Sequence, residues 1–194
     1  MHAARHAFLL RAAHPGERSL HVACGTDRLA FIDLAYGLTT ILTDISDASL
    51  QTLAQQLADL QQGVGAVAGA AEFRCLAVED LEGPQGFAPA SIHHLTLQNL
   101  FNAQLHSPQA HVSIVEALLA IITDAGTCFI TESEGLLLEK RARIRGMHVA
   151  RLGQIPGYYD EGVLMLRVHK PAPHASSQAS PFPFPARSPI MRSR

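Results

Sequence analysis

The chain alternates short apolar runs with longer stretches in which apolar residues recur every three or four positions. The short runs predict strands, and the spacing of three and four predicts amphipathic helices. One helix is expected between its N-cap Ser46 and Gly63, and another between the N-cap pair Ser107 and Pro108 and Gly126. The predicted strands cover residues 19–23, 39–43, 72–77, 92–97, 127–131, 147–152 and 163–169, and the other two predicted helices cover 27–36 and 138–145.

The order of these elements predicts how they assemble. Alternating strands and helices followed by two closely spaced strands are typical of an α/β domain. We expect a doubly wound, mostly parallel sheet of seven strands, with helices on both faces and an antiparallel C-terminal hairpin. The chain then divides into an N-terminal segment (1–18), the α/β domain (19–170) and a Pro- and Ser-rich tail (171–194). We expect the tail to be disordered, although its PFPFP stretch also suits docking to a partner as a polyproline helix.

Composition limits the function classes. Of the 194 residues, 47% are hydrophobic and 16% are charged, which suits one globular domain. A formal net charge of -2 provides no basic surface for counterion release, so nucleic acid is not an expected partner. No stretch approaches the roughly 20 apolar residues of a membrane span, and the N-terminal apolar patch is too short for a signal peptide. We therefore expect no membrane attachment.

The cysteines and the short motifs narrow the chemistry further. Cys24, Cys75 and Cys128 lie in or beside apolar runs, without a CxxC pair or the spacing of metal ligands. We expect buried, reduced thiols, a cytoplasmic location and no metal site. The chain also lacks GxxxxGK, HExxH and nucleophile-elbow motifs, which disfavours nucleoside-triphosphatase, metalloprotease and hydrolase functions.

A candidate binding site lies where the first two predicted strands end. Gly25, in the turn ACGTD, lets the backbone approach a ligand, and the following helix begins with unpaired N–H groups. Asp44 ends the second strand and can accept hydrogen bonds from a ribose diol. In a parallel sheet the two features lie on the same edge, where ligands bind. A helix-capping or turn role for Asp44 remains the alternative.

The sequence around this turn resembles a known family. The run LHVACGTDRLAFIDLAYGLTTILTDIS is similar to motif I and the following acidic motif of class I S-adenosylmethionine-dependent methyltransferases. The resemblance continues, in the same order, through FRCLAVEDL, LTLQNLF, EALLAIITDAGTCFITESE and GYYDEGVLMLRVHKP. It covers residues 20–171 and implies a Rossmann-like methyltransferase fold with S-adenosylmethionine as cofactor.

The resemblance also implies roles for individual residues. The turn formed by Ala23, Cys24 and Gly25 would contact the methionine portion of the cofactor. Asp44 would hold the ribose hydroxyls, and Ile45 would contact the adenine. Glu79 and Asp80 would lie near the adenine amino group. Gln98 and Asn99 would face the methyl donor and the substrate.

The sequence departs from the family pattern at three positions. His21 stands in place of the usual acid of motif I, Asp27 in place of a frequent glycine, and Ala77 in place of an acid that contacts adenine. Asp27 suits a helix cap instead. A methyltransferase-like fold that has become a catalytically silent binding or scaffold protein is therefore the alternative function.

No residue of the sequence is assigned as a catalytic base. His93 and His94 alternate in a strand and point to opposite faces, so core histidines are the favoured interpretation and a base high on the strand is the alternative. The predicted function is methyl transfer to a small molecule. The acceptor pocket is expected to be open or to be completed by a second copy of the chain in a homo-oligomer.

Overall fold

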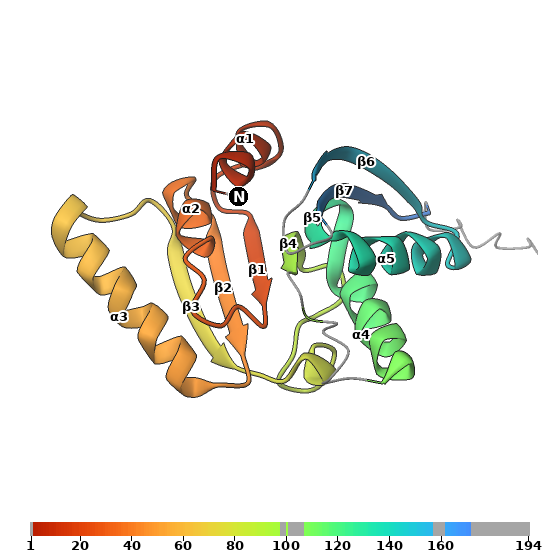
Figure 1. The fold of residues 1–194 in the computed structure, drawn as a ribbon, viewed down its shortest axis with the longest axis horizontal. Helices are drawn as coiled ribbons and strands as arrows, with labels where there is room; N and C mark the ends of the chain where they lie inside the picture. Colours follow the sequence, from red (N-terminus) through yellow and green to blue (C-terminus); the bar gives the residue numbers. More distant parts are fainter. Residues whose placement is uncertain (1, 98–99, 101–106, 157–161, 172–194) are drawn as a thin grey trace, which may run out of the picture.

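A seven-stranded sheet organises the computed structural model, which describes residues 2–97, 100, 107–156 and 162–171 (Figure 1). The strands lie in the order β3-β2-β1-β4-β5-β7-β6. Neighbouring strands from β3 to β5 are parallel, and β7 is antiparallel to both β5 and β6. The strands are β1 (Arg18–Val22), β2 (Thr39–Asp44), β3 (Ala70–Cys75), β4 (Ile92–Leu97), β5 (Ile122–Thr131), β6 (His148–Ile155) and β7 (Val163–His169).

Helices cover both faces of this sheet (Figure 1). The helices are α1 (His2–Ala12), α2 (Ala30–Ala35), α3 (Asp47–Val64), α4 (Pro108–Ile121) and α5 (Glu132–Ile144), with a short 3-10 helix, η1 (Val78–Asp80). Leu20, Leu95 and Leu118 belong to the core between the sheet and α4 and α5. On the other face, Phe8 and Phe129 join α1 and α2 to β5 in a second apolar cluster. The predicted doubly wound α/β fold with its antiparallel C-terminal hairpin is confirmed.

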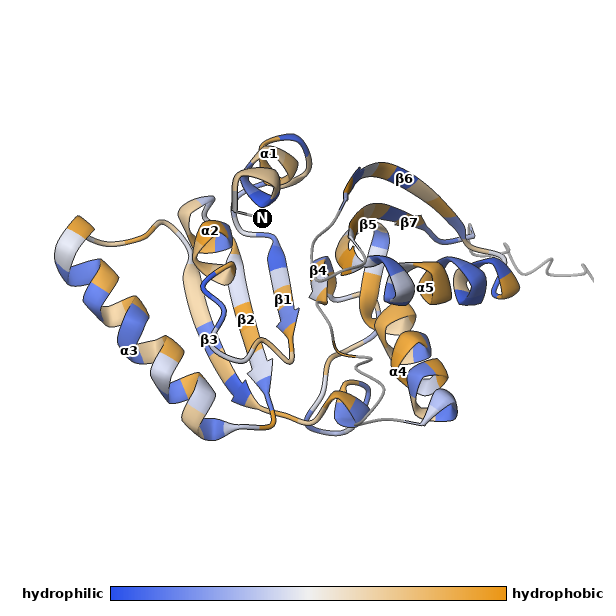
Figure 2. Ribbon diagram, in the orientation of Figure 1, coloured by the Kyte–Doolittle hydropathy of each residue, from blue (hydrophilic) through white to orange (hydrophobic). Residues whose placement is uncertain are grey.

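The third helix shows how the apolar stripe directs packing. Its buried residues Leu50 and Leu53 pack with Leu42 of β2. Hydrophilic and hydrophobic residues alternate along α3, whereas α4 is mostly hydrophobic (Figure 2). The difference follows from burial, because α4 contributes six buried residues to the core and α3 only three.

Replacing Ser46 by Ala is expected to lower the free energy of unfolding by about 1 kcal/mol. The Ser46 hydroxyl accepts a hydrogen bond from the N–H of Ser49, as predicted for the N-cap of α3. Urea unfolding followed by circular dichroism measures the loss. Ser113→Ala is the matched control, since that hydroxyl only bonds the Gln109 carbonyl within α4. Equal stabilities of the two variants would contradict the capping role.

Several predicted boundaries are wrong. The second helix begins at Ala30 rather than at residue 27, because Asp27 forms a turn before it. The third strand lies two residues earlier than predicted, at Ala70–Cys75. The helix α4 ends at Ile121, and β5 starts at once at Ile122 instead of after Gly126. The residues on both sides of this junction are apolar, so their spacing does not show where the helix ends and the strand begins.

The N-terminal segment forms a helix that the sequence analysis did not assign. Leu9 of α1 is fully buried, and Phe8 packs with Phe129 at 6.1 Å between ring centroids. Residues 172–194 of the predicted tail lie outside the described residues, and so do Gln98 and Asn99. No helix in the described part of the chain is long and apolar enough to cross a membrane.

Candidate functional site

The predicted site residues lie at the carboxyl ends of the parallel strands. Ala23, Cys24 and Gly25 follow β1, and Asp44 is the last residue of β2. Figure 1 shows the ends of β1, β2 and β3 and the helix η1 along one edge of the sheet. The strand order reverses between β1 and β4, and this reversal marks the edge where α/β sheets bind ligands.

Two hydrogen bonds join the turn after β1 to the end of β2, and the first runs from the N–H of Cys24 to the carbonyl of Thr43 at 3.0 Å. The N–H of Gly25 donates to Oδ2 of Asp44 at 2.8 Å. Gly25 has a φ of +53° and Ala23 a φ of +49°, so the chain turns sharply through the left-handed region. A Cβ atom on Gly25 would meet nothing within 4 Å, which leaves space beside the backbone. The two features that the sequence placed on one edge are therefore in direct contact.

Asp44 has a turn role and retains capacity for a ligand. Its other oxygen, Oδ1, accepts a hydrogen bond from the N–H of Ser46 at 2.8 Å. The carboxylate thus organises the entry to α3, which was the alternative considered for it. A carboxylate has about four acceptor sites, so two remain after these bonds. The two roles of Asp44 are compatible.

An apolar side chain lies exposed beside this carboxylate. Ile45 is 77% exposed, the largest exposed fraction among the large hydrophobic residues that the structure describes. Its carbonyl accepts a weak hydrogen bond from the Cys75 thiol at 3.4 Å. Cys75 is exposed, so the expectation that all three thiols are buried is wrong at this position. Ile45 is thus an exposed apolar side chain directly after Asp44.

The other predicted site residues are less closely joined to Asp44. Glu79 and Asp80 are exposed on η1, and their neighbour Val78 is buried in the core. The chain before them is tied to β2 by a hydrogen bond of 3.0 Å from the N–H of Leu76 to the carbonyl of Asp44. Among the described residues, no group of three metal-ligating side chains is placed to hold a metal ion.

Two carboxylates give the turn a negative environment. Asp27 accepts a hydrogen bond from the N–H of Leu29 at 3.0 Å in the turn before α2. The predicted capping role of Asp27 is wrong, because the N-cap of α2 is Leu29 and no side chain caps it. Burial raises the pKa of the Cys24 thiol to about 12, and the charges of Asp44 and Asp27 add to this effect. The thiol therefore stays protonated at neutral pH and is not a nucleophile. The same charges favour a cation at the turn.

Known proteins were compared with this chain by sequence and by structure. No protein-family model and no curated protein sequence matches the chain. Among solved structures, magnesium protoporphyrin IX methyltransferase (ChlM) from Synechocystis PCC 6803 with bound SAH gives a TM-score of 0.66 at 12% identity, over 87% of this chain and 81% of that one. TYW2 from P. horikoshii in complex with MeSAdo gives 0.60 at 14% identity, over 86% of this chain. The chain spans 62% of the length of that TYW2 chain.

An rRNA methylase from Streptococcus thermophilus also matches, with a TM-score of 0.56 at 17% identity over 86% of this chain and 94% of that one. Together with the strand order, these likenesses decide the fold. The fold is that of the class I methyltransferases. The resemblance found in the sequence is confirmed at this level, and identities of 12 to 17% carry it no further.

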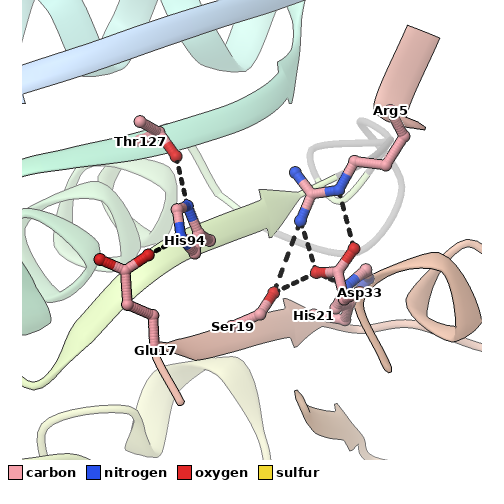
Figure 3. A network of polar contacts seen from close by, with 7 residues as sticks. All are labelled: Arg5, Glu17, Ser19, His21, Asp33, His94 and Thr127. Atoms are coloured by element: carbon pink, nitrogen blue, oxygen red, sulfur yellow. Dashed lines mark hydrogen bonds and ion pairs between the residues drawn. The ribbon is translucent and has the colours of Figure 1, made fainter. Parts of the chain in front are cut away.

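At the motif I position of this methyltransferase fold, His21 belongs to a buried network (Figure 3). Its Nε2 lies 2.9 Å from Oδ2 of Asp33 on α2. Arg5 of α1 donates to the same carboxylate from Nε at 3.0 Å and from Nη2 at 2.5 Å, and the Ser19 hydroxyl donates to it too. His21 therefore points into the layer between the sheet and α1 and α2.

The charges of this network are fully enclosed. Arg5 and Asp33 are both 0% exposed. Burial acts to raise the pKa of Asp33, but the charges of Arg5 and His21 outweigh it and hold that pKa far below its usual range. The sequence analysis missed this network. An available signal was Asp33 itself, a charged residue four positions after Leu29 on the apolar side of a helix.

A second network involves one of the paired histidines (Figure 3). Thr127 Oγ1 lies 2.7 Å from Nδ1 of His94, and Glu17 Oε2 lies 2.8 Å from its Nε2. These partners fit a neutral ring that accepts from Thr127 and donates to Glu17. His93 accepts from the N–H of Arg18 at 3.1 Å. The expectation of a satisfied core histidine is confirmed for His94, whereas His93 is half-buried. Both residues line one small pocket with Glu17, so the expectation that they cannot share a site is wrong.

Stability is expected to fall as the pH drops below neutrality. Burial lowers the pKa of His94 from about 6.5, against the opposing effect of Glu17. The unfolded chain then takes up a proton that the folded chain resists, so stability is lost from pH 7.5 down to the folded pKa. Burial acts to raise the pKa of Glu17, but hydrogen bonds from the His14 N–H and from His94 lower it below its usual value. A further loss of folding stability is therefore expected below about pH 4.5, as this carboxylate takes up a proton.

The measurement is urea unfolding at pH 7.5, 6.5 and 5.5 for the wild type and for His94→Gln. The variant is expected to lose less stability over this interval, because it lacks the group that titrates. His148→Gln is the control, since His148 is exposed at the edge strand β6. Parallel pH profiles for the wild type and His94→Gln would show that His94 does not contribute.

Proposed function

We propose that the chain binds S-adenosylmethionine at the edge formed by Gly25 and Asp44 and transfers its methyl group to a small molecule. The observation that supports this most directly is the 2.8 Å hydrogen bond between Gly25 and Asp44, at the point of strand reversal in a methyltransferase fold. It joins a turn open to a ligand to a carboxylate with free acceptor sites. ChlM and TYW2 were solved with bound SAH and MeSAdo, two adenosyl compounds.

The residues at this edge fit the proposed cofactor. Asp44 would accept hydrogen bonds from the ribose hydroxyls, and Ile45 would lie against the adenine. The turn formed by Ala23, Cys24 and Gly25 would hold the methionine portion. Glu79 and Asp80 would complete the adenine end of the site, and Asn99, predicted for the donor end, lies outside the described residues. The negative field of Asp27 and Asp44 at this turn suits a cofactor that carries a positive sulfonium.

The cofactor supplies an electrophilic methyl group, so the protein has to position rather than activate it. The turn and Asp44 fix one reactant relative to the sheet, and placing a nucleophile in line converts a bimolecular step into an effectively unimolecular one. Exposed Ile45 becomes covered when the site is filled, which excludes water from part of the adenine pocket. A reducing, cytoplasmic setting is part of the proposal, since all three cysteines are free thiols.

A small-molecule acceptor is the preferred substrate class. The formal net charge of -2 gives no general attraction for a polyanion. The matching structures include both a porphyrin methyltransferase and an rRNA methylase, so the fold itself suits either kind of acceptor. The two classes are separated by incubating the protein with methyl-labelled cofactor and either total RNA or a small-molecule extract. Label in the extract alone is expected, and label in RNA would overturn this choice.

Isothermal titration with S-adenosylmethionine and with S-adenosylhomocysteine tests the cofactor. Stoichiometric binding is expected, and ligand at 100 times its Kd should stabilise the fold by about 2.7 kcal/mol. Absence of heat and of any thermal shift at millimolar concentrations would refute cofactor binding.

A second function is favoured by the state of the motif I position. His21 is turned into the core and bound to Asp33, so it presents no acid to the cofactor. This arrangement suits a silent binding protein that keeps the site and has lost the reaction. Cofactor binding without label in either the extract or RNA would favour that function over methyl transfer.

A further inference from the structure

A groove of about 360 Å³ lies between α1 and the hairpin of β6 and β7. Five residues of α1 line it at the helical spacing of three and four: Ala4, Ala7, Phe8, Arg11 and Ala12. Met165 and Arg167 of β7 form the opposite wall. Because the alanines are small, the helix leaves room where it passes the hairpin. The volume falls within the range of small-molecule pockets.

The charges in this groove are of one sign. Arg11 and Arg167 line it, and no acidic residue of the described chain does so. Neither arginine forms an ion pair with a described residue, unlike Arg5, Arg74, Arg141, Arg145 and Arg151. The Nε atom of Arg167 is buried and has no hydrogen-bond partner. A buried donor without a partner is costly, so an acceptor bound in the groove would relieve that cost.

The register of the sheet shows that Arg167 ends a row of polar side chains. Ser19, His94, Thr127 and Arg167 are successive partners across β1, β4, β5 and β7. The first three have their partners in the two networks of Figure 3. Arg167 also lines a smaller polar pocket of about 230 Å³, formed with Glu17, His93 and His94. Arg167 therefore lines both an apolar pocket and a polar one, and the polar pocket also contains the acidic Glu17 and Asp124.

We propose that this groove binds a small organic anion with an apolar body, whose carboxylate or sulfonate pairs with Arg167. The apolar body lies against Phe8, Met165 and the alanines of α1, and Arg11 adds to the attraction for the anion. The site is distinct from the proposed methyltransferase site. Arg167 lies opposite Thr127, four residues or roughly 13 Å before the carboxyl end of β5 at Thr131. The ligand is thus bound away from the proposed cofactor edge.

Fluorescence titration of the full chain with two naphthyl probes tests this site. 1-Anilinonaphthalene-8-sulfonate carries the anion, and N-phenyl-1-naphthylamine is the same body without it. We expect saturable 1:1 binding of the sulfonate and at least tenfold weaker binding of the amine. Arg167→Met should weaken the sulfonate at least tenfold and leave the amine unchanged. This variant should also keep or raise the Tm, because it removes an unpartnered donor.

Two further variants distinguish the groove from other surfaces. Ala7→Trp should fill the apolar compartment and abolish binding of both probes, and Ala7 is exposed on α1, so the fold tolerates the change. Arg143→Met is the matched control, since Arg143 lines a different pocket, near β6, that also contains Arg151. It should leave both affinities unchanged. These expectations do not depend on cofactor binding, which titration with S-adenosylmethionine reports separately.

Several results would overturn the proposal. Equal affinity for the two probes would show that the groove does not recognise the anionic group. Unchanged affinity of the sulfonate in Arg167→Met would show that Arg167 does not bind it. Loss of binding in Arg143→Met alone would assign the probe to the other pocket. If sedimentation detects a dimer and probe binding weakens as the dimer forms, the groove would be an interface with a second copy of the chain.

Discussion

Asp33→Ala is expected to lower the free energy of unfolding by about 3–5 kcal/mol, the largest loss among the substitutions considered for this protein. The substitution removes the carboxylate that receives two hydrogen bonds from Arg5 and further bonds from Ser19 and His21. Arg5 is fully buried and would keep its charge without a partner. Urea unfolding monitored by circular dichroism at pH 7.5 measures the effect.

The expected loss of stability is large because both charges are buried, and a more exposed ion pair provides the control. Arg74 and Glu72 are 31% and 42% exposed, so Glu72→Ala should cost less than about 1 kcal/mol. The double variant Arg5→Met/Asp33→Leu removes both buried charges and should be more stable than Asp33→Ala. If Asp33→Ala costs no more than Glu72→Ala, the network does not hold α1 on the sheet.

The Arg5 side chain contributes more than its charge. Its guanidinium lies 5.6 Å from the centre of the Phe8 ring and 5.3 Å from that of Phe129. The contact with Phe129 links the N-terminal helix to β5, the ion pair with Asp33 links it to α2, and a hydrogen bond to the Ser19 hydroxyl links it to β1. Disruption of the Arg5 side chain therefore affects the packing of α1 on β1, α2 and β5.

The sequence was sufficient to predict the elements whose signals are local. The stripe of α3 and its cap at Ser46 follow from spacing and residue type, and both are observed. The meeting of Gly25 and Asp44 could also be predicted, because parallel strands place their carboxyl ends on one edge. The signal for α3 lies within one helix and its cap. The meeting of Gly25 and Asp44 follows from the rule that parallel strands end on the same edge of a sheet.

What the sequence did not predict depends on long-range pairing. Arg5 and Asp33 are 28 positions apart, and nothing in the spacing of either residue identifies its partner. The role of Arg167 follows from its register opposite Thr127, which only the assembled sheet defines. The sequence predicted the meeting of Asp44 with Gly25 and offered a turn role for Asp44 as an alternative, but only the structure shows that one carboxylate does both. Local periodicity predicts which face a residue occupies but not which group it meets.

The dual use of Asp44 affects how the proposed function has to be tested. A substitution there removes a ligand group and also loosens the turn that bears Gly25. Stability and affinity must therefore be measured on the same variants. A loss of affinity is informative only where the variant is folded at the temperature of the titration.

Asp44→Ala is expected to weaken binding of S-adenosylmethionine by about 10- to 100-fold, the loss typical of a hydrogen bond to a charged group. Isothermal titration at 15 °C measures the affinity, and thermal unfolding without ligand confirms the fold. Asp44→Asn keeps one acceptor oxygen and the size of the side chain, so an intermediate loss is expected. Both variants should lose some stability, because the N–H groups of Gly25 and Ser46 lose their acceptor.

The neighbouring acid Asp47 provides the matched control for this prediction. Asp47 lies three residues later, is exposed on the first turn of α3 and bonds only to the side chain of Gln51. Asp47→Asn removes the same charge from the same region and should leave the affinity unchanged. Equal affinity in Asp44→Ala and the wild type, with both folded, would restrict Asp44 to its turn role. The edge would then lack the group that distinguishes a ribose, and the methyltransferase proposal would have to be abandoned.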